Sequence, residues 1–300
     1  MMKNSALLAS YLRARRSLVQ PEDVGIRRER NRRVDGLRRQ EVAALADISF
    51  DYYLRLEQGR HQQPSDQVLA SLGRALLLDE DAQSHLYRIA RISAGMSRAP
   101  VRPAAELDES MSRLLEHWSH TPAVVIDRNQ DVVRANRLAI VLGRGHLDPG
   151  NNLVLSTFEQ AVRDTSPDWE YSAIEVVAAL RYHGDPFDPR LREIVGILSH
   201  RDADFRHIWA RHDARPLRSG IMHSAIDMAG LVELRFQNFA VPGHTGHTLS
   251  TFFAEPDTRG AIALASLADR LALTSPGAGV SAGIRATADL RATADLRAAG

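Results

Sequence analysis

The sequence predicts two domains, an all-α five-helix domain at residues 1–92 and an α+β domain with an antiparallel sheet at residues 107–272. Three observations predict this. Apolar residues recur at helical spacing to about residue 92, a stretch with Pro100 and Pro103 then has little apolar pattern, and short β-type runs alternate with helical segments beyond it. We therefore assign residues 93–106 to a linker. Residues 273–300 form a low-complexity tail, in which the hexad Arg285–Leu290 repeats as Arg291–Leu296.

The composition is that of an ordinary globular chain. Its 300 residues are 44% hydrophobic and 25% charged, which excludes a wholly disordered protein. The sequence contains no uncharged apolar run of roughly eighteen residues and no signal-peptide pattern, so we expect no membrane span and a cytoplasmic location. The absence of cysteine excludes disulfides, thiol nucleophiles and thiolate zinc sites.

Positive charge is concentrated at the N-terminal end of the chain. Residues 1–60 carry 13 of the 38 Lys and Arg residues and 8 of the 37 Asp and Glu residues, a balance of +5, which leaves −4 for the remainder. A basic domain joined to a mildly acidic one indicates a module that binds a polyanion.

Local signals place the helices of the first domain. The first helix ends near Leu18, before Pro21 and an arginine-rich segment, Arg27–Arg33. Ser49 is a favourable N-cap and Gly59 a favourable left-handed C-cap for a helix over Phe50–Gln58. The other predicted helices span Leu37–Ala46, the residues from Ser65 to Leu76, and Asp79–Ala90.

Two of these helices, joined by the turn Asp47–Ser49, form a helix-turn-helix unit with Ile48 at its corner. The unit resembles the Cro/C1 (XRE-type) helix-turn-helix family in Glu41-Val42-Ala43, Ile48-Ser49 and Leu56-Glu57-Gln58-Gly59, and the resemblance continues through the fifth helix. Asp47 stands where the family commonly has glycine, and aspartate tolerates a left-handed backbone better than most residues. The resemblance implies a double-stranded DNA operator as the partner.

Duplex geometry then assigns roles to individual side chains. A major groove about 12 Å wide admits one helix, whose N-terminal side chains reach the base edges. We expect base readout by Phe50, Asp51, Tyr52 and Arg55, and phosphate contacts from Arg32, Arg33, Arg38, Arg39, Gln40 and Arg60. Two alternatives stay open: Tyr52 belongs to the core, as we expect for Tyr53, or the segment Arg27–Arg33 is only a solvated loop.

The second domain combines a hairpin, several helices and three further strands. The hairpin has β-type runs at Ala123–Asp127 and Asp131–Asn136 around a polar turn. Helices are predicted at Arg137–Leu142, Leu153–Asp164, Pro167–His183, Pro189–Ser199 and Asp202–His212, and strands at Leu217–Ser224, Leu231–Val241 and His247–Ala254. This order predicts an α+β domain.

That order resembles a PAS-type sensor, and the residues resemble the MmyB-like ligand-binding domain of actinobacterial regulators. The similarity lies in Thr121-Pro122-Ala123, Asn136-Arg137, Asn152-Leu153, Asp168-Trp169, Leu180-Arg181, Asp188-Pro189-Arg190-Leu191, Phe205–Asp213 and Glu255-Pro256. Ala135 departs from the family, which usually has tryptophan there, and the loss of that ring is expected to enlarge or reshape a pocket.

The resemblance implies a ligand like a fatty acid, held between sheet and helices, and no other cofactor. Such a site needs apolar walls and a few polar groups at one end. For the carboxylate the candidates are Asn136, Arg137, Arg181 and Arg211, and for the walls Phe158, Trp169, Leu180 and Trp209, although each aromatic fits a core role better. Arg181 is equally suited to pair with Asp213 or Glu175.

We therefore expect a transcription factor and not an enzyme, acting as a homodimer in which the ligand shifts the relative placement of two DNA-binding domains. The rival hypothesis is a second domain that binds a protein partner and no small molecule. A third hypothesis, an enzyme acting on an acyl substrate, is the least favoured, because the sequence has no nucleophile elbow, phosphate loop or dinucleotide fingerprint. His244 and His247 lack a third ligand at metal spacing, so we expect no metal site.

Overall fold

The computed structural model describes residues 5–29, 32–60, 63–95, 109–226, 229–244 and 246–273. The chain forms two compact units, the first of Met1–Ala105, Asp127–Asp131 and Asn152–Arg218, the second of Glu106–Ile126, Val132–Asn151 and Ser219–Gly300. All but the first residues of the predicted linker and of the predicted tail lie outside the described residues. Within the described ranges, no helix combines the length and apolar character needed to cross a membrane.

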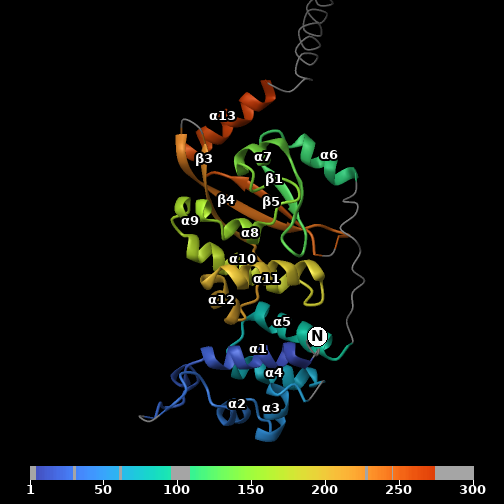
Figure 1. Ribbon diagram of the computed structural model, residues 1–300, viewed down its shortest axis with the longest axis vertical. Coiled ribbons are helices and arrows are strands. Elements are labelled where there is room, and N and C mark those ends of the chain that lie inside the picture. The colour runs from blue at the N-terminus through green and yellow to red at the C-terminus, as the bar shows by residue number, and fades with distance from the viewer. Residues whose placement is uncertain are drawn as a thin grey trace, which may run out of the picture. The chain divides into compact units, whose positions relative to one another are not determined.

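The first unit begins with the five helices that the sequence predicts, drawn in blue to cyan in Figure 1. They are α1 (Ser5–Leu18), α2 (Arg39–Leu45), α3 (Phe50–Glu57), α4 (Asp66–Ala75) and α5 (Glu80–Ser93), with a 3₁₀ turn, η1 (Pro21–Val24), after α1. We refer to this group as the head. The hydroxyls of Ser49 and Ser65 accept hydrogen bonds from backbone N–H groups in the first turns of α3 and α4, so the predicted N-cap at Ser49 is confirmed and Ser65 caps α4 in the same way.

The backbone of the head's turns follows the sequence signals. Asp47 has φ 54° and Gly59 has φ 66°, so both take the left-handed conformation expected of them. Tyr53 is fully buried in the core of the head, as predicted. Tyr52 is partly buried against the same core. Its ring therefore has one side on the core and one side toward solvent.

The first unit also contains α8 (Leu153–Thr157), α9 (Gln160–Thr165), α10 (Trp169–His183), α11 (Pro189–Arg201) and α12 (Ala203–Ala210). The single helix predicted over Leu153–Asp164 was wrong, because α8 stops at Thr157. The indole N–H of Trp169 donates to the Thr157 carbonyl oxygen at 2.7 Å, which a continuing helix would use for its own backbone. Phe158 then turns its ring into the core and is 5% exposed. A tertiary contact thus ends the helix where the periodicity continues.

Aromatic rings dominate the core of these helices. Phe205 of α12 is fully buried, meets the Phe158 ring edge-on at 5.4 Å and stacks on Trp209 at 5.6 Å. Trp169 meets the other side of this group through Phe158, at 5.6 Å. Buried aromatic pairs of this kind stabilise a core beyond the area that they remove from water.

The second unit holds an antiparallel sheet with strand order β2-β1-β5-β4-β3. The strands are β1 (Ala123–Ile126), β2 (Val132–Ala135), β3 (Ser219–Ile226), β4 (Gly230–Ala240) and β5 (Thr248–Phe253), so the predicted hairpin and three later strands are confirmed within two residues. Its helices are α6 (Glu109–His117), α7 (Arg137–Gly143) and α13 (Arg259–Leu273). The sequence analysis assigned α7 but neither α6 nor α13.

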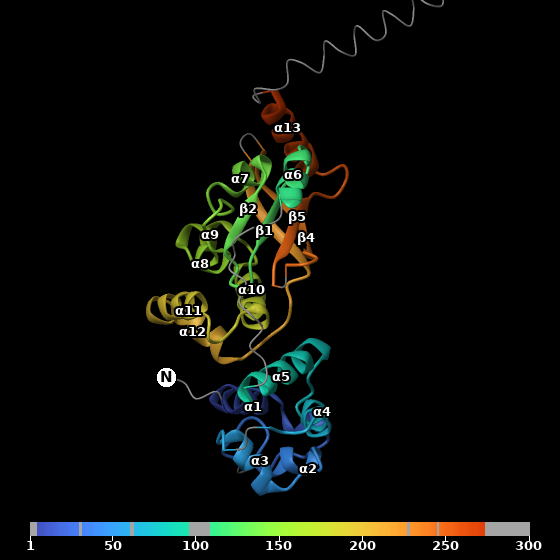
Figure 2. The same cartoon turned by 90° about the vertical axis from the view of Figure 1, so that its right-hand side faces the viewer.

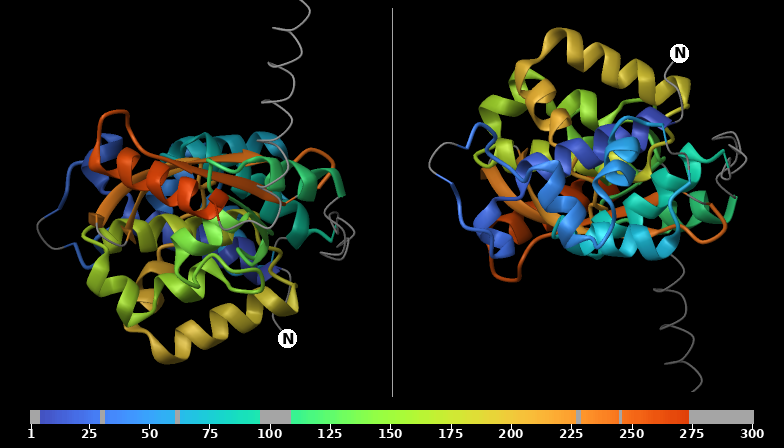
Figure 3. Two further views of the ribbon diagram at one scale, coloured as in Figure 1. Left: turned by 90° about the horizontal axis from the view of Figure 1, so that it is seen from above. Right: turned by 90° about the horizontal axis from the view of Figure 1, so that it is seen from below.

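Helices cover parts of this sheet. In Figure 2, α6 lies beside β1 and β5, and its Leu115 packs with Val125 and Leu249 of those strands. The view from above in Figure 3 shows α13, in red, across the orange strands, and the Gly260 backbone approaches the Glu233 carbonyl oxygen so closely that a Cβ would lie 2.7 Å from it. This close approach requires glycine at the start of α13.

Candidate DNA-binding surface and ligand-binding residues

Helix α3 presents the side chains predicted to read bases on its solvent side. Phe50 is 41% exposed, and Asp51 and Arg55 are also exposed. Tyr52 is partly buried, and burial raises the pKa of its hydroxyl. Three of the four side chains predicted to read bases are therefore exposed on α3, and the fourth, Tyr52, is half-buried.

The opposite side of α3 is fixed by a buried carboxylate that the sequence analysis did not single out for this role. Glu57 is 2% exposed and accepts hydrogen bonds from Arg16 Nε of α1 at 2.6 Å, from Arg39 Nε of α2 at 2.6 Å and from the Tyr53 hydroxyl at 2.8 Å. Burial raises the pKa of Glu57, but the hydrogen bonds from Arg16 and Arg39 outweigh it and hold the pKa below its usual value. This carboxylate joins three helices of the head.

The residues predicted to contact phosphates differ in how free their side chains are. Arg33, Gln40 and Arg60 are exposed. Arg39 is 45% exposed while its Nε binds Glu57, so its two Nη atoms are the part of the guanidinium that solvent reaches. The side chain of Arg38 is 39% exposed and donates to Glu29 at 2.9 Å. Arg39 therefore lies at the head's surface in a fixed orientation.

Arg32 does not fit the expected phosphate contact. Its side chain is only 3% exposed, and its Nη1 and Nη2 atoms donate to the two carboxylate oxygens of Glu41 at 2.7 and 2.6 Å. Nη2 also donates to the Gly36 carbonyl oxygen at 2.6 Å. The hydrogen bonds from Arg32 lower the pKa of Glu41. Because these bonds and the low exposure hold its guanidinium inside the head, Arg32 does not fit the predicted phosphate contact; it anchors the arginine-rich segment to α2.

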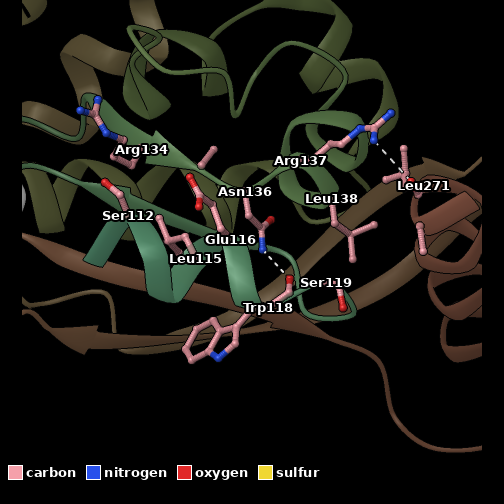
Figure 4. A pocket seen from close by; sticks show the side chains of 12 residues that line it. Ser112, Leu115, Glu116, Trp118, Ser119, Arg134, Asn136, Arg137, Leu138 and Leu271 are labelled. Atoms are coloured by element: carbon pink, nitrogen blue, oxygen red, sulfur yellow. Dashed lines mark hydrogen bonds between the residues drawn. The ribbon is translucent and has the colours of Figure 1, made fainter. Parts of the chain in front are cut away.

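Two of the predicted ligand-binding residues, Asn136 and Arg137, lie in the second unit beside a pocket of about 380 Å³ (Figure 4). Asn136 caps α7: its Oδ1 accepts from the backbone N–H of Ala139 at 2.9 Å, and its Nδ2 donates to the carbonyl oxygens of Trp118 and Thr121. The side-chain amide of Asn136 is therefore bonded to the surrounding backbone, which it stabilises. The pocket's lining includes residues that the sequence analysis did not identify, Leu115, Glu116, Trp118 and Leu271, together with Ala135, the residue that departs from the family.

The other six lie in the first unit. Phe158, Trp169, Leu180 and Trp209 belong to its apolar core, and the Arg211 guanidinium pairs with Asp213 at 2.9 Å. Arg181 binds neither Asp213 nor Glu175 directly. Its Nη1 donates to His212 Nδ1 at 2.8 Å, its Nη2 donates to the Trp209 carbonyl oxygen, and its guanidinium lies 3.7 Å from the centre of the Trp209 ring. The eight candidates thus form two groups, one in each unit.

Several residues of the resemblance have structural tasks. Asp188 caps α11, and Arg190 makes a two-bond ion pair with Asp131 at 2.7 and 2.9 Å. Asn152 caps α8 and donates to Asp131 at 2.9 Å. The His244 and His247 rings lie 5.7 Å apart, and no group of three potential metal ligands occurs among the residues that the structure describes.

Comparison with known families agrees with this arrangement. A helix-turn-helix domain model matches residues 7–86, and the model of the MmyB-like transcription regulator ligand binding domain matches residues 107–267. A search of curated proteins gave no significant match. The second match, which is to a domain of transcription regulators, covers more than half of the chain. The chain therefore belongs to the MmyB-like transcription regulators, DNA-binding proteins that join a helix-turn-helix domain to a ligand-binding domain.

Proposed function

We propose that this regulator recognises a specific DNA operator through the exposed side of α3. The observation that carries the proposal is the contrast between the two sides of that helix. Phe50, Asp51 and Arg55 face solvent, while Tyr53 and Glu57 lock the other side into the head. Readout in the major groove requires a rigidly held helix whose outward side chains are exposed to the base edges.

Within this proposal, Arg55 reads guanine through its forked guanidinium and Asp51 accepts from a cytosine amino group. The side chains of Arg39, Gln40 and Arg60 hold phosphates, which sets the register of α3 without reading sequence. Arg39 is pre-oriented for this by its bond to Glu57.

Selection from a random duplex library, followed by affinity measurements, tests the readout. Arg55→Ala is expected to relax preference at one base pair, at about 1–3 kcal/mol of lost discrimination. Arg60→Ala is the matched control, because it is exposed, lies after the C-terminal end of α3 and should weaken all sequences alike while reducing the salt dependence. Equal loss on all sequences for both variants would contradict the assignment.

We further propose that the ligand-binding domain takes a fatty-acid-like molecule with an anionic head. The family supports a ligand, and the aromatic group Phe158, Trp169 and Trp209 supports an apolar one. Arg181 supports the anionic end, since its buried Nε atom has no hydrogen-bond partner within the described residues. Mass spectrometry of extracts from purified, denatured protein should find a stoichiometric lipid. Consistently empty protein would instead favour the rival hypothesis of a protein-interaction domain.

We also propose that the regulator acts as a homodimer. Four large apolar side chains of the sheet, Ile221, Leu231, Phe239 and Phe253, are 41–52% exposed, and the strand register places them on one face around Arg235. Such an exposed apolar face supports association. Light scattering after size-exclusion chromatography should give a molar mass twice that of one chain, and Phe239→Asp should lower this mass. If the unsubstituted protein has the mass of one chain at every concentration, dimerisation is refuted.

A further inference from the structure

An irregular segment, Arg211–Arg218, joins α12 to β3 and is held by ion pairs along its length. Asp213 accepts from Arg211 at 2.9 Å and from Arg15 at 2.7 Å, Arg215 pairs with Glu175, and Arg218 makes a two-bond pair with Asp81 at 2.6 and 2.8 Å. Connecting segments usually run over the surface and are more mobile than the elements that they join. This one is fixed along its whole length, and we call it the junction segment.

The partners of the junction segment come from two different domains. Arg15 lies on α1 and Asp81 on α5, both in the helix-turn-helix domain. Glu175 and Arg181 lie on α10, within the residues that match the ligand-binding family. A direct bond adds to this bridge, since Arg88 of α5 donates to the backbone carbonyl oxygens of Gly184 and Arg181, at 3.0 and 2.9 Å.

Asp213 is the electrostatic centre of this contact. It is 9% exposed and directly bonds two guanidinium groups. Burial lowers the pKa of Arg181 to about 9, and the charge of Asp213 opposes that shift. Two guanidinium groups therefore depend directly on this carboxylate. Its loss leaves the charge of Arg15, whose side chain is 18% exposed, without a counterion and largely away from water.

His212 and Arg181 connect this contact to the aromatic core. Burial, with Arg181 and Arg15 nearby, lowers the pKa of His212 to about 3, so the ring is neutral near pH 7 and its Nδ1 accepts from Arg181. The His212 ring meets the Tyr11 ring of α1 edge-on at 6.3 Å. On the other side Arg181 covers Trp209, which stacks on Phe205. A continuous chain of contacts thus runs from the core of the ligand-binding helices to α1.

We propose that the junction segment is a clamp, with Asp213 as its hub, that fixes the helix-turn-helix domain on α10 so that the ligand-binding domain sets the position of the recognition helix. The regulatory role of this clamp rests on the proposed function, whereas the rigidity of the contact is a separate property that can be measured by itself. Since the segment leads directly into β3, it is also the covalent route from the sheet to this contact.

The absence of cysteine allows a direct test on the full chain. Nitroxide labels at Gln67→Cys on α4 and His200→Cys on α11, both exposed positions, report the distance between the head and the ligand-binding helices by double electron–electron resonance. The parent should give one narrow distance distribution. Asp213→Asn should broaden it at least twofold, while Glu193→Gln, which removes an exposed carboxylate from an ion pair on α11, should leave it narrow.

A second variant guards against a folding defect in the first. Arg218→Ala removes a side chain that is 65% exposed, so it should preserve the circular dichroism spectrum and melting transition while still broadening the distribution. A narrow, unshifted distribution in both Asp213→Asn and Arg218→Ala would overturn the proposal. Broadening that Glu193→Gln shares would also overturn it.

Binding of a labelled duplex at low salt separates this proposal from the proposed function. A parent that binds no duplex but whose distances broaden in Asp213→Asn would refute DNA recognition and retain the clamp. If the parent binds duplex and Asp213→Asn leaves the distance distribution between the labels unchanged, the clamp is refuted and DNA recognition is retained.

Discussion

Replacing Glu57 by glutamine should destabilise the head, because it removes the carboxylate from a buried cluster that joins α1, α2 and α3. The Glu57 side chain is 1% exposed and binds Arg16, whose side chain is 14% exposed, and Arg39, whose side chain is 45% exposed. Glutamine keeps the shape, but its amide nitrogen must face a guanidinium donor. Arg39 can turn toward water, whereas Arg16 cannot do so without disrupting the core.

The magnitude follows from the burial of that remaining charge. Removing one partner of a buried ion pair costs about 3–5 kcal/mol, and we expect about 3 kcal/mol because Arg39 is half exposed. Every 1.4 kcal/mol corresponds to a tenfold change in an equilibrium constant. Hydrogen exchange at the α1 and α3 amides that are exposed only when the head unfolds should therefore be about 100-fold faster.

Hydrogen exchange measured by mass spectrometry on the full chain provides the assay. Glu22→Gln is the matched control, since it also removes a carboxylate from an arginine pair, but the side chains of Glu22 and Arg28 are 51% and 43% exposed. The control should show no measurable change. If Glu57→Gln leaves exchange as slow as Glu22→Gln does, the buried cluster does not hold the head together.

The pH dependence of the same experiment has a definite sign. The folded-state pKa of Glu57 lies below its usual value, so its stabilisation is complete above the unfolded pKa of about 4.3 and is lost as pH falls through the folded value. The difference between parent and Glu57→Gln should therefore be constant near neutral pH and shrink in acid. A difference that grows as the pH falls would contradict this reasoning.

Three further substitutions test the packing. Ser49→Ala removes the N-cap of α3 and should cost about 1 kcal/mol, measured as faster exchange of the first α3 amides. Phe205→Ala should cost about 3–5 kcal/mol by urea denaturation followed by tryptophan fluorescence, against less than about 0.5 kcal/mol for Tyr171→Ala, which is 64% exposed. Gly36→Ala places a Cβ 2.5 Å from two backbone carbonyl oxygens of α1 and should lower the melting temperature. Gly196 lies within α11, and a Cβ added there meets no atom within 4 Å, so Gly196→Ala should raise the melting temperature.

The structure divides the arginines of the head into two classes that the sequence presents as one. Arg16 and Arg32 are inside, each bound to a carboxylate, while Arg33, Arg55 and Arg60 are exposed. Under the proposed function, the exposed arginines supply the salt-dependent affinity for phosphates, and the buried ones hold the helices that carry them. The high positive charge of residues 1–60 therefore overstates the number of side chains available to DNA.

Local chemistry determined the elements of the head from the sequence alone. Ser49 and Ser65 cap helices wherever their hydroxyls meet free N–H groups, and Asp47 and Gly59 take left-handed conformations that few residues accept. Each signal acts within a few residues, so no knowledge of distant partners is needed. The antiparallel strands of the second unit were predictable for a related reason, because β-branched runs bounded by turn residues identify them locally.

Only the tertiary structure decided what depends on residues far apart in the chain. Trp169 ends α8 by binding Thr157, against the local periodicity, and Arg32 is unavailable to DNA because Glu41 binds it. Arg15 and Asp213 are 198 positions apart, and nothing near either residue indicates the other. A charged side chain is free or occupied according to which counterion folding brings within about 3 Å, and that is a property of the packed chain rather than of its neighbours in sequence.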